Sequence, residues 1–188
     1  MKIISNKKEL RRNIHLEQNL GFVPTMGSIH SGHISLIKKS MSQCNKTIVS
    51  IFINKPQFNR KSDFQKYPRN IKKDISILKR LNFNYLYIPT NNQIHPNGSR
   101  KNIRISSFSK ELCGKFRPGH FKAVVDVIDK FINIIIPKKI YLGKKDMQQL
   151  KIVEDFVKNK YPQIKVIGCN TIREKNGIPY SSRNSLLS

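Results

Sequence analysis

The chain has 188 residues and a formal net charge of +25 at pH 7, because 36 Lys and Arg outnumber 11 Asp and Glu. This length fits one compact domain with a buried core and argues against a second complete domain. We expect neither a signal peptide nor a membrane span, since residues 1–13 lack an apolar segment and the most apolar run, FINIIIP at 131–137, is far shorter than a bilayer requires. A cytoplasmic protein is therefore expected.

The first half of the chain alternates short apolar runs with segments of helical period. The predicted elements, in order, are a strand over 20–24, a helix carrying Ile34, Ile37 and Met41, a strand over 46–54, a helix carrying Ile71, Ile75, Leu78 and Leu81, and a strand over 85–89. This order is strand, helix, strand, helix, strand.

The second half continues the alternation. We expect a loop over 91–101, a short extended piece over 103–107, a helix over 120–136, a strand over 139–143, a helix over 146–159 and a strand over 165–172. Such alternation is typical of a parallel sheet with helices on both faces. Asn176-Gly177 predicts a turn, and Ser182 or Asn184 could cap a further helix. We therefore expect the first domain of a longer protein, or a version that has lost its second.

The stretch PTMGSIHSGH at 24–33 places two histidines where the first predicted strand passes into a helix. Gly27 and Gly32 fit the start of the P-loop pattern GxxxxGK[ST], but His33 and Ile34 replace its lysine and hydroxyl, which excludes that site. A helix N-terminus suits a phosphate, and Gly32 has no side chain to hold a phosphate away. His30 and His33 could then donate hydrogen bonds as negative charge grows on the phosphate oxygens. Simple capping or surface roles for both rings remain open on these residues alone.

No metal site or disulfide is expected from the spacing of potential ligands. His30 and His33 lie outside an HExxH pattern and have no evident third ligand. Cys44, Cys113 and Cys169 form no CxxC pair, and we expect them to be reduced and buried.

The high positive charge alone would favour a nucleic-acid-binding protein. The lysines are spread over solvated helix faces, as in NIKKDISILKRL at 70–81, and Ala123 is the only alanine, which indicates a general drift in residue usage. Specific nucleic-acid binding is therefore not expected. A basic nucleotide- or nucleic-acid-binding module is kept as the alternative function.

Six blocks carry a family resemblance: PTMGSIHSGH, SIFINKPQF, DFQKYPR, RPGHF, KKDMQQL and SSRN. In this order and spacing they resemble pantothenate synthetases, the pantoate–β-alanine ligases of the nucleotidylyl transferase superfamily, over essentially all 188 residues. The resemblance implies the α/β class and, over residues 1–188, a Rossmann-like domain that binds nucleotide and pantoate. Its parallel sheet would be flanked by helices, and the C-terminal lid domain of the family would be absent.

The same resemblance implies a ligase that condenses pantoate with β-alanine in two steps. ATP and pantoate would give pantoyl adenylate and pyrophosphate, and β-alanine would then displace AMP to give pantothenate. Mg²⁺ would accompany ATP, with no tightly bound cofactor, and the protein would be a homodimer. Without a lid that excludes water, we expect poor turnover of the reactive adenylate.

Residue roles follow from the resemblance. ATP binding is implied for Met26, Gly27, Ser28, Ile29, His30, Ser31, Gly32, His33, Gly143, Lys144, Lys145, Asp146, Ile172, Tyr180, Ser181, Ser182 and Arg183. The implied catalytic residues are His33, as proton donor, with His30, Lys145 and Arg183. Gln57 would bind pantoate and later β-alanine, and Gln149 would bind pantoate.

Other positions are assigned less directly. Asp146 could contact a ribose hydroxyl and also cap a helix, while Gln148 is interpreted as part of a polar helix face. Arg117 and His120 lie in the RPGHF motif, and we assign them no catalytic step. We give equal weight to a structural and a functional role for them. A second alternative is an enzyme that transfers a nucleotidyl group to a different acid or phosphate. Only the paired glutamines argue against this reaction.

Two departures from the family pattern affect this expectation. Pro56, in NKPQF, lies one position later than usual and could shift the loop that holds Gln57. Lys144 occupies a position where the family commonly has glutamate, which would add positive charge beside the nucleotide.

Overall fold

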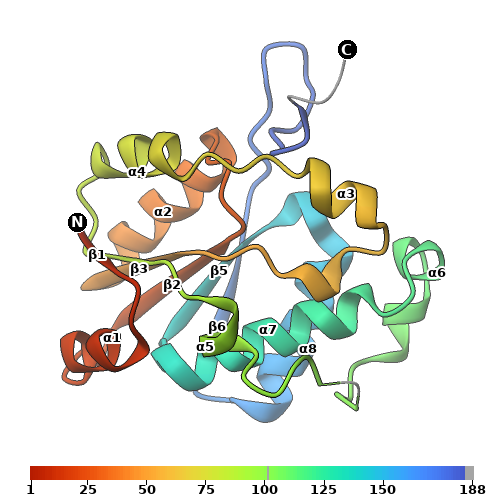
Figure 1. The fold of residues 1–188 in the computed structure, drawn as a ribbon, viewed down its shortest axis with the longest axis horizontal. Coiled ribbons are helices and arrows are strands. Elements are labelled where there is room, and N and C mark those ends of the chain that lie inside the picture. Colours follow the sequence, from red (N-terminus) through yellow and green to blue (C-terminus); the bar gives the residue numbers. More distant parts are fainter. Residues whose placement is uncertain (101, 185–188) are drawn as a thin grey trace.

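A six-stranded parallel sheet forms the centre of the protein, in a computed structural model that describes residues 1–100 and 102–184 (Figure 1). The strands are β1 (Lys2–Ile4), β2 (Leu20–Thr25), β3 (Lys46–Ile51), β4 (Tyr85–Tyr87), β5 (Lys139–Gly143) and β6 (Lys165–Cys169), in the spatial order β1-β4-β3-β2-β5-β6. Each neighbouring pair is parallel, as the alternation of strands and helices predicts.

Helices cover both faces of the sheet. The α-helices are α1 (Lys7–Ile14), α2 (Ser31–Gln43), α3 (Lys61–Lys66), α4 (Ile71–Lys79), α5 (Asn91–Ile94), α6 (Cys113–Phe116), α7 (His120–Ile135) and α8 (Met147–Lys160), and the short 3₁₀ turns are η1 (Lys55–Gln57), η2 (Ser107–Lys110) and η3 (Lys144–Asp146). Helices α1, α7 and α8 contribute to one hydrophobic cluster, whereas α2 and α4 contribute to another. Every helix within the described ranges is too short or too polar to cross a membrane.

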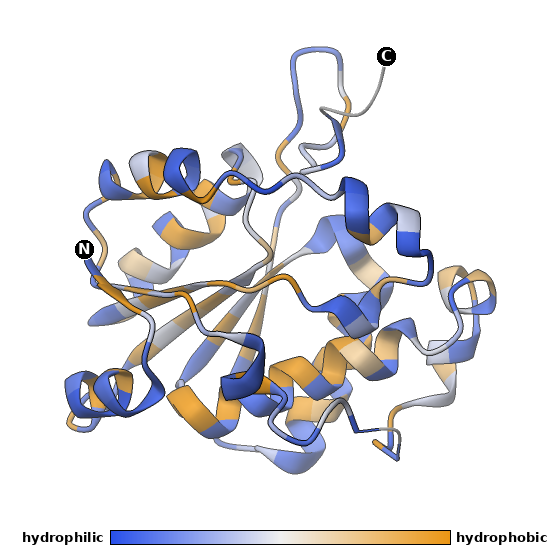
Figure 2. Ribbon diagram, viewed as in Figure 1, coloured by the Kyte–Doolittle hydropathy of each residue, from blue (hydrophilic) through white to orange (hydrophobic). Residues whose placement is uncertain are grey.

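Alternate residues of each inner strand pack into opposite clusters. In β2, Phe22 belongs to the cluster under α7 and α8, and Val23 belongs to the cluster under α2 and α4. Ile48 and Val49 of β3 divide in the same way, because successive side chains of a strand point to opposite faces. Figure 2 shows the resulting apolar strands and the apolar side of α7 between more polar outer surfaces. Both faces are therefore buried, which explains the continuous apolar runs in the sequence.

Several elements differ from the sequence-based expectation. Strand β1 and helices α1, α3, α5 and α6 are not among the elements predicted from the sequence, and the extended piece expected over 103–107 forms no strand. Strand β3 ends at Ile51 instead of continuing to residue 54. Met41 and Ile71, expected on buried helix stripes, are exposed. The cysteines are free, as expected, but Cys113 is exposed and Cys44 and Cys169 are only partly buried, so the expectation of burial is wrong.

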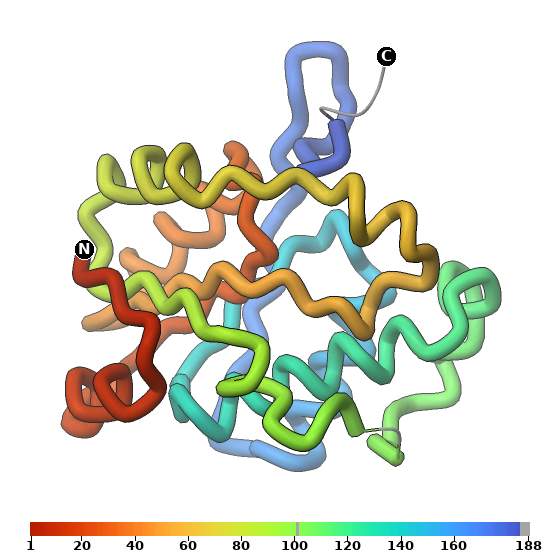
Figure 3. Tube along the Cα trace, viewed as in Figure 1, coloured from red at the N-terminus to blue at the C-terminus, as the bar shows by residue number. Residues whose placement is uncertain are grey.

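The segment after β6 folds back as a turn above the carboxyl ends of the strands. Gly177 has a φ of +84°, and its N–H donates to the carbonyl of Glu174 at 2.9 Å, which confirms the turn expected at Asn176-Gly177. Figure 3 shows this segment projecting from the body and returning beside the connection between α3 and α4. A helix continuing past Asn184 would lie outside the described residues.

The sheet order places a crevice at the carboxyl ends of β2 and β5. From β2 the chain continues to β3, its neighbour on one side. The neighbour on the other side is β5, from which the chain continues outward to β6, so the strand order changes direction between β2 and β5. Ligands of open α/β sheets bind outside the carboxyl ends of strands at such a switch point. The loop 26–30 and η3 begin at this edge, so the fold directs two of the motif segments toward one place.

Candidate active site

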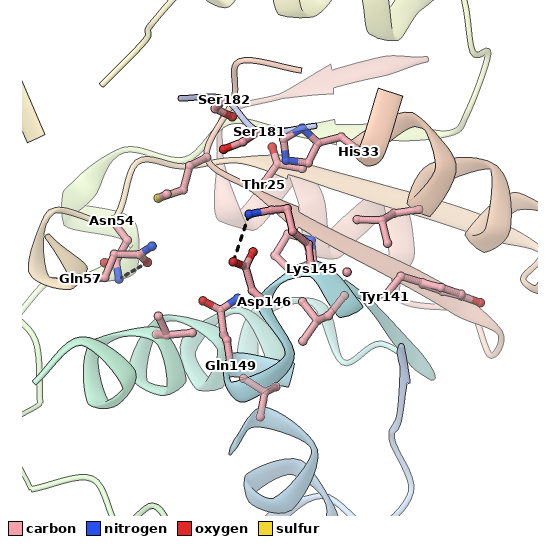
Figure 4. A pocket seen from close by; sticks show the side chains of 18 of the residues that line it. Thr25, His33, Asn54, Gln57, Tyr141, Lys145, Asp146, Gln149, Ser181 and Ser182 are labelled. Carbon is pink, nitrogen blue, oxygen red and sulfur yellow. Dashed lines mark hydrogen bonds and ion pairs between the residues drawn. The ribbon is translucent and has the colours of Figure 1, made fainter. Parts of the chain in front are cut away.

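One cleft at the carboxyl ends of β2 and β5 collects most of the residues singled out in the sequence (Figure 4). It is lined by Met26, His30, Gly32, His33, Gln57, Gly143, Lys145, Asp146, Gln149, Ile172, Tyr180, Ser181, Ser182 and Arg183. Gly27, Ser28, Ile29, Ser31 and Lys144 do not line it. The four residues expected to be catalytic, which come from three separate segments of the chain, therefore face a common space.

His30 caps helix α2 as well as lining the cleft. Its Nδ1 accepts a hydrogen bond of 3.1 Å from the N–H of Gly32, so the neutral ring carries its proton on Nε2. The ring stacks on His33 with centroids 4.0 Å apart, and on Tyr180 at 6.1 Å. A Cβ at Gly32 would lie 2.9 Å from the His30 ring, so glycine permits this close cap. Capping and lining the cleft are thus compatible roles for one histidine.

Both histidines are neutral in this environment. Burial lowers the pKa of His33 to about 3, and the proximity of the second ionisable ring, His30, and of the Lys145 charge adds to the effect. Burial also lowers the pKa of His30 to about 4, assisted by Lys145 and opposed by Asp146. Nδ1 of His33 is buried and has no hydrogen-bond partner in the part of the chain that the structure describes. A neutral imidazole can still donate one N–H, so neither ring needs an ionic charge to bind a phosphate oxygen.

The loop between β2 and α2 is held from beneath by Asp74 of α4. The two carboxylate oxygens of this buried residue accept hydrogen bonds from the N–H groups of Ser28 and Ile29, each of 2.8 Å. Gly27 has a φ of +79°, and a Cβ there would lie 2.9 Å from Asp74. The N–H groups of Ser28 and Ile29 are therefore used within the fold, and neither residue lines the cleft, so ATP contacts through them stay a prediction.

The segment after β5 places a lysine and a carboxylate near the centre of the cleft (Figure 4). Lys145 Nζ lies 3.1 Å from Asp146 Oδ1, and Gln149 follows one turn later on α8. Asp146 occupies the N-cap position of α8, but its side chain makes no capping hydrogen bond, so the expected capping role is wrong. The pair leaves an ammonium group and a carboxylate available to a polar ligand.

Two neighbours of this segment have structural roles. Gln148 is buried and donates to the carbonyls of Phe108 and Glu111, so its assignment to a polar helix face is wrong. Lys144 does not line the cleft, and its Nζ donates to Oδ1 of Asn170, a residue that does, at 3.0 Å.

Gln57 is held at the other side of the cleft (Figure 4). Asn54 Nδ2 donates to Gln57 Oε1 at 3.1 Å, and the Gln57 carbonyl lies 2.7 Å from Nδ1 of His120. Pro56 lies in the first turn of η1, where a missing N–H and a fixed φ are tolerated. Gln57 therefore lines the cleft despite the later proline of NKPQF. The contact of His120 is with the backbone carbonyl of Gln57, not with its side chain.

Arg183 is bound to a carboxylate of this chain. Its Nε and Nη2 donate to Oδ1 and Oδ2 of Asp63, each at 3.0 Å, and its guanidinium lies over the rings of Phe58 and Tyr67 at 5.8 and 5.2 Å. Burial, together with the Arg183 charge, lowers the pKa of the neighbouring Arg117. This side of the cleft therefore concentrates positive charge, partly balanced by Asp63.

Sequence reasoning missed three residues that organise the site. Asp63 lies within the DFQKYPR block, Asn54 lies three residues before Gln57, and Asp74 lies within the amphipathic helix. A carboxylate buried on a helix stripe is unusual enough to have marked Asp74 as a candidate. Asp63 and Asn54 have partners 120 and 41 residues away in the chain, which spacing alone could not identify.

A protein cage for a metal ion is absent from the described residues. Within 1–100 and 102–184 there is no group of three or more His, Cys, Asp or Glu side chains placed to hold one. A divalent cation at this site would therefore take most of its ligands from a phosphate substrate and water.

Known proteins show the same fold and sequence pattern. The family model of pantoate-beta-alanine ligase matches residues 2–188. The pantothenate synthetase of Sulfurihydrogenibium sp. is 44% identical over 171 residues, covering 91% of this chain and 61% of that protein. The one from Endomicrobium trichonymphae is 44% identical and covers all of this chain and 68% of its own length. The chain thus spans roughly two thirds of the length of such relatives.

Solved structures agree. The pantothenate synthetase of Thermus thermophilus has a TM-score of 0.95 at 32% identity, with all of this chain and 68% of that one covered. The pantoate-beta-alanine ligase of Francisella tularensis, solved in complex with beta-gamma ATP and beta-alanine, has a TM-score of 0.93 at 40% identity, with all of this chain and 74% of that one covered. The chain therefore belongs to the pantoate-beta-alanine ligase family.

Proposed function

We propose that this chain activates pantoate with ATP and joins the product to β-alanine to form pantothenate. The observation that carries the proposal is the convergence of His30, His33, Lys145 and Arg183 on one cleft that Gln57 and Gln149 also line. Cations and N–H donors suit a triphosphate, and two amides suit a substrate with hydroxyls and a carboxylate. The family membership and the ligands of the Francisella protein support the same substrates.

In the first step, a carboxylate oxygen of pantoate attacks the α-phosphorus of ATP. The new bond joins this oxygen to phosphorus, and the bond from phosphorus to the pyrophosphate oxygen breaks. The ammonium of Lys145 and the N–H groups of His30 and His33 stabilise the negative charge that grows on the phosphate oxygens. Because both rings start neutral, they act first as hydrogen-bond donors, and a bound triphosphate raises the pKa of each ring from its low starting value.

In the second step, the amine of β-alanine attacks the acyl carbon of the adenylate. The carbon–nitrogen bond forms, the bond to the AMP oxygen breaks so that AMP leaves, and the nitrogen releases a proton to solvent. Gln57 holds pantoate in the first step and β-alanine in the second, while Gln149 holds pantoate throughout.

Mg²⁺ enters this scheme with ATP as part of the substrate. The carboxylate of Asp146 is the cleft group that fits the ion or a ribose hydroxyl, because hard cations prefer oxygen ligands.

The proposal extends to the organisation of the protein. Residues 1–188 form the nucleotide- and pantoate-binding domain of a cytoplasmic homodimer, and a further domain such as the longer relatives carry would close over the adenylate. Sedimentation tests the dimer. Rates of pantothenate formation with and without an added C-terminal domain test the role of closure, and equal rates would refute it.

Pantoate-dependent exchange of pyrophosphate into ATP tests the first step. We expect exchange with the wild-type chain and its loss in His33→Ala, with little change in thermal stability. His15→Ala is the matched control, because His15 is an exposed histidine at the C-terminal end of α1. Unchanged exchange in His33→Ala would contradict the proposal.

Exchange supported equally by other acids would favour a different nucleotidyl transferase. The nucleic-acid-binding alternative is not proposed, since the similarity to ligases covers the whole chain.

A further inference from the structure

A line of buried polar groups runs from helix α7 to Gln57. Asp126, which is fully buried, lies 3.0 Å from Nζ of Lys130, and the same Nζ lies 2.6 Å from Nδ1 of His95. Nε2 of His95 lies 2.8 Å from Oδ1 of Asn54, whose Nδ2 lies 3.1 Å from Oε1 of Gln57. The line thus connects a carboxylate outside the cleft to an amide inside it.

The Lys130 ammonium determines the direction of the hydrogen bonds that follow it in this line, and the carbonyl of Ala123, which can only accept, fixes the Asn54 amide in the same sense. A lysine ammonium can only donate, so Nδ1 of His95 accepts and Nε2 carries the proton. Nε2–H therefore donates to Oδ1 of Asn54, which leaves the Asn54 amide nitrogen to donate onward. It donates to Gln57 Oε1 and also to the carbonyl of Ala123 at 3.1 Å. Gln57 must accept here, and its own Nε2 is the atom left for a ligand.

His95 is suited to this role by its surroundings. It is buried, and burial together with the Lys130 charge lowers its pKa against the opposing effect of Asp126. A neutral ring is required, since a protonated one could not accept from Lys130. The Asp126 carboxylate lies 3.8 Å from Nδ1, beyond hydrogen-bond distance, and is engaged by Arg100 and Ser99.

We propose that Asp126, Lys130, His95 and Asn54 form a positioning relay that presents the amide N–H of Gln57, not its carbonyl oxygen, to the substrate. Rotation of a glutamine amide by half a turn exchanges a donor for an acceptor with almost no change of shape. The relay removes this ambiguity. The inference rests on the proposed function, because it assumes that Gln57 binds the carboxylate or hydroxyl oxygens of pantoate.

Two lysine variants give a matched test. Lys130 and Lys160 each bind a buried aspartate of α7, Asp126 and Asp129, but the contact with His95 is made by Lys130. We expect Lys130→Met to raise the KM for pantoate about tenfold, the scale of one lost hydrogen bond to a charged group, while the KM for ATP stays within about twofold. Lys160→Met should leave both constants near the wild-type values. Equal effects of the two variants on the pantoate KM would overturn the relay.

His95 provides the rescue experiment. His95→Gln retains a side-chain N–H that can reach Asn54, whereas His95→Met does not. Pantoate KM should stay near wild type in the first variant and rise in the second. A rise of the same size in both would count against the relay.

A ligand-free measurement separates this inference from the proposed function. In ¹⁵N-labelled protein, both side-chain amide protons of Asn54 should exchange slowly with solvent, and they should exchange faster in Lys130→Met but not in Lys160→Met. If the wild-type chain shows this pattern but no pantoate-dependent exchange, the relay stands and the proposed substrate fails. If the Asn54 protons exchange equally in all three, or if Lys130→Met alone loses its fold, the relay is overturned as an orienting device.

Discussion

The guanidinium of Arg183 donates two hydrogen bonds, each of 3.0 Å, to the two carboxylate oxygens of Asp63. This is the geometry in which arginine also binds phosphate, so a carboxylate of the chain occupies the fork that a triphosphate would use. The segment after β6 is thereby tied to α3 before nucleotide enters. A nucleotide that binds Arg183 as proposed must therefore displace or share this contact.

Asp63→Asn is expected to tighten binding of a non-hydrolysable ATP analogue by about two- to fivefold. Partly exposed ion pairs contribute roughly 0.5–1 kcal/mol, and that competition is removed when the carboxylate becomes an amide. Isothermal titration calorimetry measures the change, with Asp155→Asn as an exposed control. Weaker binding would show that Asp63 positions Arg183 for phosphate instead of competing with it.

Lys145→Met is expected to slow pantoate-dependent exchange by about 10²–10³-fold, since it removes a charge that stabilises the growing negative charge on phosphate. The same variant should raise the pKa values of His30 and His33, because the Lys145 charge helps to lower both. NMR titration of the histidine ring protons measures the second effect without substrate. Lys158→Met, at the exposed far end of α8, should change neither quantity.

The stability of the folded chain should depend on pH through His33. Its pKa is lowered from 6.5 to about 3 by folding, so the unfolded chain binds more protons between these values. The free energy of unfolding therefore falls as pH falls below about 6.5, with a slope of up to about 1.4 kcal/mol per pH unit from this group. Urea denaturation at several pH values should give a shallower slope for His33→Gln. Parallel slopes for both proteins would refute this account.

Asp74→Asn is expected to lower the free energy of unfolding by about 1–3 kcal/mol. The amide keeps one acceptor oxygen but turns an NH₂ group toward the second backbone N–H, which leaves a buried donor without a partner. The loop carrying His30 should loosen at the same time, so ATP affinity should also fall. Urea denaturation and calorimetry measure the two effects, and Asp155→Asn again serves as the exposed control. A variant as stable as wild type would contradict the role given to Asp74.

Local patterns were sufficient for most of the fold and for the central motif of the site. The inner strands are buried on both faces and read as apolar runs, and the longer helices show their period of 3.6. Strand β1 has three residues, of which only Ile4 is buried, so its pattern is too short to detect. The short helices α3, α5 and α6 are held by their surroundings more than by an apolar stripe.

The sequence by itself determined the α/β alternation and the residue types of the HSGH, KKD and SSR segments that line the cleft, because each is a pattern of neighbours within a few positions. The tertiary structure decided which buried partner each of these residues has. Asp63 meets Arg183 across 120 residues, Asp74 meets Ser28 across 46, and Lys130 meets His95 across 35. Such pairs form because the fold packs helices and loops that are distant in the chain against one another, and a buried polar group must then find whatever partner the fold places beside it.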